Sequence, residues 1–428
     1  MTLWLQPPRG TQDRFPDEFA VRKHIFDTWR KVCLSFGYEE YLWPLVEHAD
    51  IWRAKSGEDV WGSELTLITD REGKISDLAL RPEMTPSVTR MVASKYPSLS
   101  KPIRWFSIAN FYRNERPQRG RNREFRQLNI DMFGETSQLA ELEALQMAME
   151  IMFAFDAPQD SFVLKINHRH LIENFLLEVV GLSPEQKTNM IRLMDKWEKL
   201  PREAFVATAI ELGASTSQTE QVVQFLSATS LSELLEVLPA LATQPSIAEM
   251  QLLMQQMSDI WYGAWITFVP SLMRWFDYYD GLVFEVFDKH PDNNRAMFGG
   301  GRYNGLAEIF GSKEQIPAIG SAPGDEPMRL FLESWGLLQA IQNKIQEVIY
   351  VQLLDASVAL EAARLAIRLR KEGNNVELST QVKTAQKAFS YAEKKGYTQL
   401  ILIWNDEIHS QTVKIKHIHT GEEKSISL

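Results

Sequence analysis

Six arginines lie within the fifteen residues from Arg113 to Gln127, "RNERPQRGRNREFRQ", of a 428-residue chain whose formal net charge is −10. A guanidinium group is planar, always charged and able to bind phosphate or carboxylate through two parallel hydrogen bonds. Alternating apolar residues on both sides of the segment indicate strands, which would hold the arginines against a pocket. The segment therefore predicts binding of a polyphosphate ligand or an RNA end.

A plainer interpretation of this segment is a solvated surface loop whose charges keep the protein soluble. Two features argue against it. Glu115 and Glu124 alternate with the arginines and could orient them through ion pairs. Phe125 begins the second strand, where its ring offers a flat surface for stacking on a nucleobase. We therefore favour a binding loop.

The composition limits the remaining function classes. An acidic chain with a pI near 5.5 is not expected to coat nucleic acid non-specifically, so any such contact must be local. A single cysteine, Cys33, excludes an internal disulfide, is typical of a reducing compartment and leaves no thiolate cluster for structural zinc. His168 and His170 invite a metal-binding interpretation. Without a carboxylate or thiolate at ligand spacing, however, we expect surface or capping roles for them.

No segment of the sequence predicts export or membrane insertion. The first fifteen residues lack the basic region, apolar run and small-residue cleavage site of a secretory signal. The most apolar stretch, residues 144–155, is shorter than the roughly 20 residues that a membrane span needs, and Glu150 interrupts it. We expect this stretch to be a buried helix. The sequence therefore predicts a cytoplasmic protein with no membrane partner.

Regular elements surround the arginine segment. Residues 17–36 have the apolar period of an amphipathic helix, and residues 41–46 follow as a strand. Pro44 has no N–H to donate, so this strand should lie at a sheet edge or an interface. The pattern then predicts a hairpin at residues 63–80 and a helix at 85–97 that begins with Thr85 and Pro86. Two strands should follow, at residues 103–115 and 125–134.

Two later regions differ in character. From about residue 183 to 257 the sequence is helical and poor in strand-forming residues, which predicts a helical insertion. After residue 340, strands and helices alternate, a pattern typical of a small α/β domain with a largely parallel sheet. The chain is also too long for one compact core of ordinary size. We therefore expect two domains, residues 1–340 and 341–428.

The arginine segment resembles the second signature motif of class II aminoacyl-tRNA synthetases. Arg113 and Glu115 match its RxE element, and Arg121 and Phe125 match its RxxxF element. The stretches "ERPQ" and "QLNIDMFG" are similar to those of histidyl-tRNA synthetases in particular.

Further similarity to that family extends over most of the chain. It includes "PRGTQD", "FGYEEYLWPLVE", "LRPEMT", "RWFDYYDGLVFE" and "GGRYNGL", which begin at residues 8, 36, 80, 274 and 300. The resemblance implies an α+β catalytic core with a mixed, mainly antiparallel sheet of the class II synthetase type. It also implies a helical insertion that grips the tRNA acceptor stem, a C-terminal α/β anticodon-binding domain, and a homodimer with Pro44 at its interface.

The same resemblance implies a histidine–tRNA ligase that uses ATP. In such enzymes the carboxylate of histidine attacks the α-phosphate of ATP, and histidine then passes to the 3′ end of tRNA(His). Catalysis in this step depends on positioning and on charge neutralisation. Arg113 would hold the α-phosphate opposite Arg274, an arginine peculiar to this family. The other ATP contacts implied are Glu115 and Phe125 at the adenine, Arg121 at the outer phosphates with Mg²⁺, and Glu326 in the third motif.

The resemblance also implies a histidine pocket and a tRNA contact. Glu83, Thr85, Gln127 and Asp131 would surround the amino acid. Tyr278, Tyr279 and Tyr303 would lie near its imidazole ring. Arg274 would also belong to the pocket. The paired tyrosines could be core residues of a strand, but their place just after Arg274 favours the pocket. Tyr303 could instead belong to an ordinary glycine-rich turn. Gln118 and Arg119, at the tip of the arginine segment, would contact the tRNA end.

The chain departs from the family at the third motif. An arginine that binds the γ-phosphate is usual there, whereas ungapped alignment places Pro327 at its position. Arg329 lies two residues further on, roughly 200° around a helix and so on its other side. Pro327 could change this geometry by restarting the helix with Asp325 as its cap. Smaller departures are Trp275 in place of glycine and Asp131 in place of glutamate.

Two alternatives to an active ligase remain open. One is a catalytically silent paralogue that senses histidine as the regulatory subunit of ATP phosphoribosyltransferase, although that paralogue generally lacks the anticodon-binding domain. The other is a protein that binds tRNA without charging it, which would keep the C-terminal domain and lose the phosphate-binding arginines. The presence of Arg113 and Arg274 favours the ligase.

Overall fold

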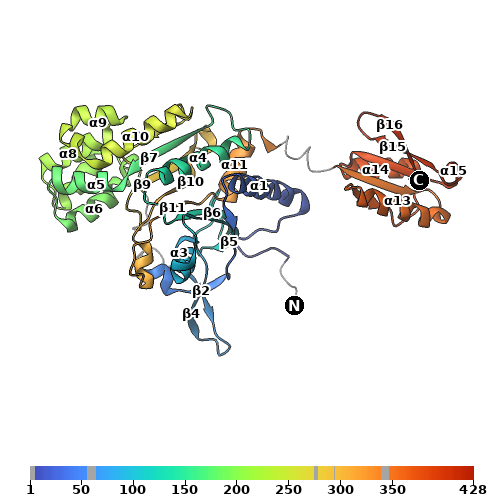
Figure 1. The fold of residues 1–428 in the computed structure, drawn as a ribbon, viewed down its shortest axis with the longest axis horizontal. Helices are drawn as coiled ribbons and strands as arrows, with labels where there is room; N and C mark the ends of the chain where they lie inside the picture. The colour runs from blue at the N-terminus through green and yellow to red at the C-terminus, as the bar shows by residue number, and fades with distance from the viewer. Residues whose placement is uncertain (1–4, 55–63, 274–277, 294, 339–346) are drawn as a thin grey trace. The chain divides into compact units, whose positions relative to one another are not determined.

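The chain folds into two compact units, Met1–Leu337 and Leu338–Leu428 (Figure 1). The computed structural model describes residues 5–54, 64–273, 278–293, 295–338 and 347–428. Across these ranges, no helix is both long enough and apolar enough to cross a membrane. Each unit has its own sheet and its own apolar core.

A mixed, mainly antiparallel sheet forms the centre of the larger unit, which confirms the predicted α+β class. In the described residues it has eight strands in the order β1-β5-β6-β11-β10-β9-β7-β8. The outer strands β1 and β8 pair in parallel with their neighbours, and the other neighbouring pairs are antiparallel. The strands are β1 Glu39–Glu40, β5 Ile103–Tyr112, β6 Glu124–Phe133, β7 Phe162–His168, β8 Ile266–Phe268, β9 Leu282–Asp288, β10 Arg295–Arg302 and β11 Ala318–Ser321.

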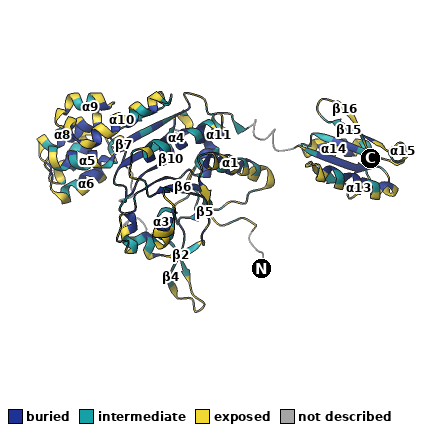
Figure 2. Ribbon diagram, viewed as in Figure 1, coloured by how far each residue is buried: buried dark blue, intermediate teal, exposed yellow. Residues whose placement is uncertain are grey.

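The arginine segment connects β5 to β6, as predicted. The two strands are antiparallel, with Phe111 opposite Phe125 and Tyr112 opposite Glu124 at the end that carries the loop. Near the loop β6 alternates between exposed and partly buried residues, whereas Leu128–Phe133 are all buried. A strand buried on both faces has no polar side to alternate with. The inner part of β6 therefore lies in the core, and its end at the loop is partly exposed. Figure 2 shows the burial of the sheet strands by colour.

Helices pack around this sheet. α1 (Pro16–Ser35) packs against α4 (Leu139–Phe153) and α11 (Asp325–Ser334), and α11 also packs on β6. α1 buries Val21, Ile25, Trp29 and Val32, which recur at the three- to four-residue spacing of one helix face. α3 (Thr85–Lys95) begins at the predicted threonine with Pro86 in its first turn, where the missing N–H costs no hydrogen bond.

A second, three-stranded sheet is built from the strands that follow β1 in the sequence. One prediction for this region is wrong. The sheet has the order β2-β4-β3, with β2 Val46–His48, β3 Thr66–Thr69 and β4 Ile75–Leu80, and the predicted hairpin joins β3 to β4. Residues 41–45, however, form no strand. The segment is instead held by Arg81, whose Nη1 donates to the carbonyl of Trp43 at 3.0 Å and whose backbone N–H donates to the carbonyl of Leu45 at 3.0 Å. Pro44 lies exposed between them.

The region from residue 183 to 257 is helical, as predicted. Together with the preceding turn it comprises α5 Arg169–Asn174, a π-helical turn Phe175–Val179, α6 Pro184–Met194, α7 Arg202–Glu211, α8 Thr216–Ser227, α9 Leu231–Val237 and α10 Pro245–Asp259. α10 covers the end of β7. The expectation of a surface role for His168 is wrong, because the residue is buried and its Nε2 lies 3.2 Å from a carboxylate oxygen of Glu249 on α10. His168 does occupy the N-cap position of α5, although its side chain makes no capping hydrogen bond.

The smaller unit is an α/β sandwich with a mixed sheet. Its strands have the order β13-β12-β14-β15-β16. Only the pairs around β12 are parallel, and β14, β15 and β16 are antiparallel, so the prediction of a largely parallel sheet is wrong for the last two strands. The elements are β12 Val348–Leu353, α13 Ala359–Lys371, β13 Asn375–Leu378, α14 Ala385–Lys394, β14 Gln399–Ile403, α15 Asn405–Ser410, β15 Thr412–His417 and β16 Glu423–Ser427.

Candidate active site

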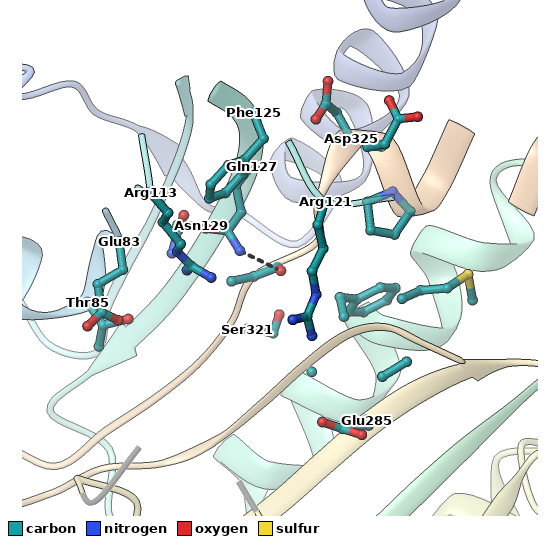
Figure 3. A pocket seen from close by; sticks show the side chains of 18 of the residues that line it. Glu83, Thr85, Arg113, Arg121, Phe125, Gln127, Asn129, Glu285, Ser321 and Asp325 are labelled. Atoms are coloured by element: carbon teal, nitrogen blue, oxygen red, sulfur yellow. Dashed lines mark hydrogen bonds between the residues drawn. The ribbon is translucent and has the colours of Figure 1, made fainter. Parts of the chain in front are cut away.

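A cavity of about 600 Å³ is lined by β6, β9, β10, β11 and the first turn of α11 (Figure 3). It brings together eleven of the sixteen predicted site residues: Glu83, Thr85, Arg113, Glu115, Arg121, Phe125, Gln127, Tyr278, Tyr279, Tyr303 and Glu326. Four others do not line it: Pro44, Gln118, Arg119 and Asp131. Arg274 and Trp275 lie outside the described residues.

Arg113 is oriented at the wall of the cavity by its neighbours. It follows β5 directly, and its backbone N–H donates to the carbonyl of Arg123 at 2.8 Å. Its Nε donates to the carbonyl of Pro82 at 3.0 Å, and its guanidinium carbon lies 5.1 Å from the ring centre of Phe125. Phe125 in turn stacks on Phe111, with ring centroids 5.7 Å apart. A guanidinium held by a carbonyl and an aromatic face is fixed in direction, as phosphate binding requires.

The tip of the arginine segment is a tight turn. Gln118 and Arg121 exchange two backbone hydrogen bonds of 2.9 Å, and Gly120 between them has a φ of +76°. A side chain at Gly120 would be strained in that conformation, and its Cβ would lie 2.3 Å from Nη1 of Arg295. The turn directs Arg121 into the cavity, 3.9 Å from the carboxylate of Glu115, and leaves Gln118 outside it.

Three tyrosines form the wall at another side of the cavity. Tyr278, Tyr279 and Tyr303 are buried, with ring centroids 4.8, 5.8 and 6.4 Å apart in tilted and edge-to-face arrangements. The hydroxyl of Tyr278 donates to Glu83 at 3.3 Å. The two interpretations of these tyrosines are therefore compatible, because they are core residues that also line the cavity.

Asp131 lies behind this wall and contacts the cavity through Tyr303. The hydroxyl of Tyr303 donates a short hydrogen bond to Oδ1 of Asp131. Burial raises the pKa of Asp131 to about 7, although the bond from Tyr303 opposes the rise. A Cβ at Gly320 would lie 2.4 Å from the same oxygen, so the close approach of β11 requires glycine there.

The first turn of α11 is held by an ion-pair network. Arg22 of α1 is buried and binds Asp325 at 2.8 Å as well as Glu326. Burial opposes ionisation of Glu326, but Arg22 and Arg329 outweigh it and lower the pKa of this carboxyl group. The expectation that Asp325 caps the helix is wrong, because Gly324 is the N-cap and Asp325 is the first helical residue. The carboxylate of Asp325 instead accepts from the backbone N–H of Arg126 at 3.1 Å.

Several lining residues were not singled out in the sequence, among them Asn129, Glu285, Arg295 and Ser321. Asn129 follows Gln127 by two residues on β6, so the two-residue strand period would have found it. Glu285 ends the stretch "DYYDGLVFE" and could have been included with it. Arg295 carries no such signal, because only the pairing of β10 with β9 and β11 brings it to the cavity.

Comparison with known proteins gives one consistent result. Residues 10–324 match the family described as histidyl-tRNA synthetase, and residues 346–428 match the anticodon binding domain family. The histidine–tRNA ligase of Leptospira biflexa is 39% identical over 420 residues, which cover 98% of this chain and 94% of that protein. The histidine–tRNA ligase of Opitutus terrae is 32% identical, with coverage of 97% and 94%.

Solved structures share the fold at lower identity. A histidyl-tRNA synthetase from Nostoc sp. superposes with a TM-score of 0.83 at 21% identity, covering 100% of this chain and 97% of that one. A protein from Bacillus halodurans described as an ATP phosphoribosyltransferase regulatory subunit/histidyl-tRNA synthetase gives a TM-score of 0.75 at 21% identity, with coverage of 94% and 99%.

Proposed function

Because the chain belongs to the histidyl-tRNA synthetase family, we propose that it is an active histidine–tRNA ligase. Histidine would attack the α-phosphate of ATP and release pyrophosphate. The 3′ end of tRNA(His) would then attack the carbonyl carbon of the adenylate and release AMP. One observation carries the proposal: arginines suited to phosphates and a carboxylate–tyrosine cluster suited to histidine line the same cavity.

ATP would occupy the side of the cavity formed by the arginine segment. Arg113 would bind the α-phosphate, since its guanidinium group is the one fixed beside Glu83 and Thr85 (Figure 3). Arg121 would bind the outer phosphates, with Glu115 and Phe125 at the adenine. Mg²⁺ would accompany the phosphates and neutralise part of their charge. Glu285 is a lining carboxylate of the type that this ion accepts as a ligand.

Histidine would bind between the arginines and the tyrosine wall. Glu83 supplies the carboxylate that an α-ammonium group needs, and Thr85 and Gln127 supply neighbouring polar groups. Tyr278, Tyr279 and Tyr303 would surround the imidazole, with Asp131 orienting the last of them. Arg274 would face Arg113 across the α-phosphate, so that two cations stabilise the charge that develops there. Glu326, paired with Arg22, would position the start of α11.

The tRNA contacts and the dimer follow the same proposal. We assign residues 1–340 to the catalytic domain, with the insertion at 183–257 on the acceptor stem, and residues 341–428 to the anticodon. Gln118 and Arg119, at the tip of the loop, would meet the tRNA end. In the homodimer Pro44 would lie at the interface. Leu42 and Leu45 beside it are 74% and 40% exposed, an apolar surface that a second copy could cover.

A regulatory paralogue is the competing function, and two observations favour it. The chain has Pro327 at the position of the family's third-motif arginine, and one of its structural neighbours is described in part as a regulatory subunit. Against it, residues 346–428 match the anticodon binding domain family, and Arg113 and Arg121 line the cavity. A sensor of histidine has no need of phosphate-binding arginines.

Exchange of labelled pyrophosphate into ATP in the presence of histidine tests the proposal. An active ligase exchanges label only when histidine, ATP and Mg²⁺ are all present. Binding of histidine without exchange would support the sensor and exclude the ligase. Exchange without charging of tRNA(His) would restrict the proposal to its first step, while binding of tRNA(His) with neither activity would favour the non-charging tRNA binder.

A further inference from the structure

The first turn of α11 provides no cation to the cavity. Pro327 lines the cavity and has no donor to offer a phosphate. Arg329 is occupied elsewhere, because its Nη2 lies 2.9 Å from Glu326 and its Nη1 lies 3.0 Å from Glu333. Arg329 is also not among the residues that line the cavity. Any protein cation for a phosphate that the third motif would normally bind must therefore come from another element.

Arg295, the first residue of β10, does line the cavity. Its Nη1 donates to the carbonyl of Arg119 at 2.8 Å, and the group lies directly against Gly120, where a Cβ would be 2.3 Å from the same nitrogen. This contact connects β10 to the tip of the arginine segment and places Arg295 beside Arg121. A guanidinium group has five N–H donors, so one bond to a carbonyl leaves most of them for a ligand.

Arg295 lies close to the like charges of Arg121 and Arg119. Within the described part of the chain, no carboxylate lies within ion-pair distance of it, in contrast to the pairs formed by Arg22, Arg104 and Arg302. Burial, followed by the charges of Arg121 and Arg119, lowers the pKa of Arg295, and Glu326 only partly opposes this. Partly buried cations that repel one another are stabilised when an anion with several oxygens binds between them.

We propose that Arg295 binds the outer phosphates of ATP together with Arg121, in place of the arginine that the third motif of the family carries. The proposal rests on the proposed ligase function, since it specifies how this chain holds the same substrate. In Figure 3, Arg113 lies beside Glu83 and Thr85, whereas Arg121 lies farther from them. Arg295 contacts the loop at the Arg121 end, which is where the β- and γ-phosphates would extend from an α-phosphate on Arg113.

The test compares Arg295→Met with Arg329→Met as a matched control. Equilibrium binding of ATP, AMP and histidine is measured by calorimetry, without turnover. We expect Arg295→Met to weaken ATP binding about tenfold to a hundredfold, as loss of a charged hydrogen bond does, and to change AMP and histidine binding less than about twofold. Arg329→Met should leave all three affinities within about twofold of the unmodified protein, because its side chain does not line the cavity.

Each other outcome overturns the proposal. Unchanged ATP affinity in Arg295→Met would exclude contact with the phosphates. Equal loss of ATP and AMP affinity would show that Arg295 only holds the loop through the carbonyl of Arg119. A larger loss in Arg329→Met would assign the phosphate to Arg329. If Arg295→Met does not fold, Arg295→Gln provides the same comparison, since glutamine removes the charge and keeps an N–H donor for the carbonyl of Arg119.

The experiment also separates this inference from the ligase function. Pyrophosphate exchange by the unmodified protein tests the function alone. Normal exchange with an unaltered ATP dependence in Arg295→Met would overturn only the role of Arg295. An unmodified protein that binds histidine but no ATP would overturn both.

Discussion

The hydroxyl of Tyr303 donates a hydrogen bond to the buried carboxyl group of Asp131, across the boundary between the cavity and the core. Tyr303 lines the cavity, and Asp131 lies behind it without lining it. The ring that would contact a bound histidine is therefore oriented by a group that the ligand does not touch. Because burial raises the pKa of Asp131 to about 7, this carboxyl group ionises near neutral pH.

Asp131 should make stability depend on pH. A carboxyl group whose pKa is higher in the folded than in the unfolded state stabilises the fold below the unfolded pKa, and this contribution is lost as pH rises to the folded value. For a rise from about 4 to about 7, the loss is at most about 4 kcal/mol. Urea unfolding between pH 4 and 8 should therefore show that Asp131→Asn gains stability relative to the unmodified protein as pH rises. If the difference in unfolding free energy between the two proteins is the same at every pH in this range, the pKa of Asp131 is not raised.

Glu83→Gln should weaken histidine binding selectively. The neutral amide cannot pair with an α-ammonium group, and loss of a charged hydrogen bond weakens binding about tenfold to a hundredfold. ATP binding should change less than about twofold, because Glu83 is not proposed to contact ATP. Calorimetric titration with histidine and with ATP measures both. Glu124→Gln is the control, since Glu124 is exposed on β6 and does not line the cavity. Equal histidine affinity in both variants would remove Glu83 from the pocket.

The sequence predicted the hairpin, the cavity arginines and the insertion because local patterns determine them. Strand alternation around residues 113–127 and helical periodicity over 183–257 need no knowledge of distant contacts. The strand at 41–46 was predicted wrongly for the opposite reason. Its backbone is held by the side chain and backbone of Arg81, 38 residues away from Trp43, and no local signal reports this.

Arg295 and His168 show the same limit within sites. Arg295 reaches the cavity because β10 pairs with β9 and β11, and the side chain then meets a loop 176 residues earlier in the chain. His168 is buried because α10 of the insertion covers the end of β7. Spacing along the sequence cannot identify partners that only the fold brings together. Whether another cation could replace the arginine missing at Pro327 likewise depended on the positions of Arg329 and Arg295, which the sequence alone left open.

Arg274→Ala should abolish formation of the adenylate while largely preserving histidine binding. Its proposed role is to stabilise charge on the α-phosphate in the transition state, and removal of one such group costs roughly 100- to 1000-fold in rate. Pyrophosphate exchange measures the rate, and calorimetry measures histidine affinity. Exchange at the unmodified rate would show that the proposed role is wrong. A parallel loss of histidine affinity would show that Arg274 also holds the bound histidine in the ground state.

Arg22→Met should destabilise the larger unit strongly. Arg22 is buried in α1 and binds Asp325 and Glu326, so its removal leaves two carboxylates in a poorly solvated site. Breaking a buried pair in this way costs roughly 3 kcal/mol or more. Arg30→Met is a matched control on the same helix, since Arg30 pairs with Glu40 at 2.8 Å but is 37% exposed, and its loss should cost less than about 1 kcal/mol. Chemical denaturation at neutral pH measures both.

The pH dependence of the Arg22→Met effect identifies its cause. The pKa of Glu326 is lowered in the folded protein, so the stability that its ion pairs provide is present at neutral pH and is lost as pH falls through the folded pKa. The difference between the unmodified protein and Arg22→Met should therefore shrink on acidification, because protonated carboxyl groups no longer need the guanidinium. A difference that is large and independent of pH would attribute the loss to packing of the Arg22 side chain between α1 and α11 rather than to its charge.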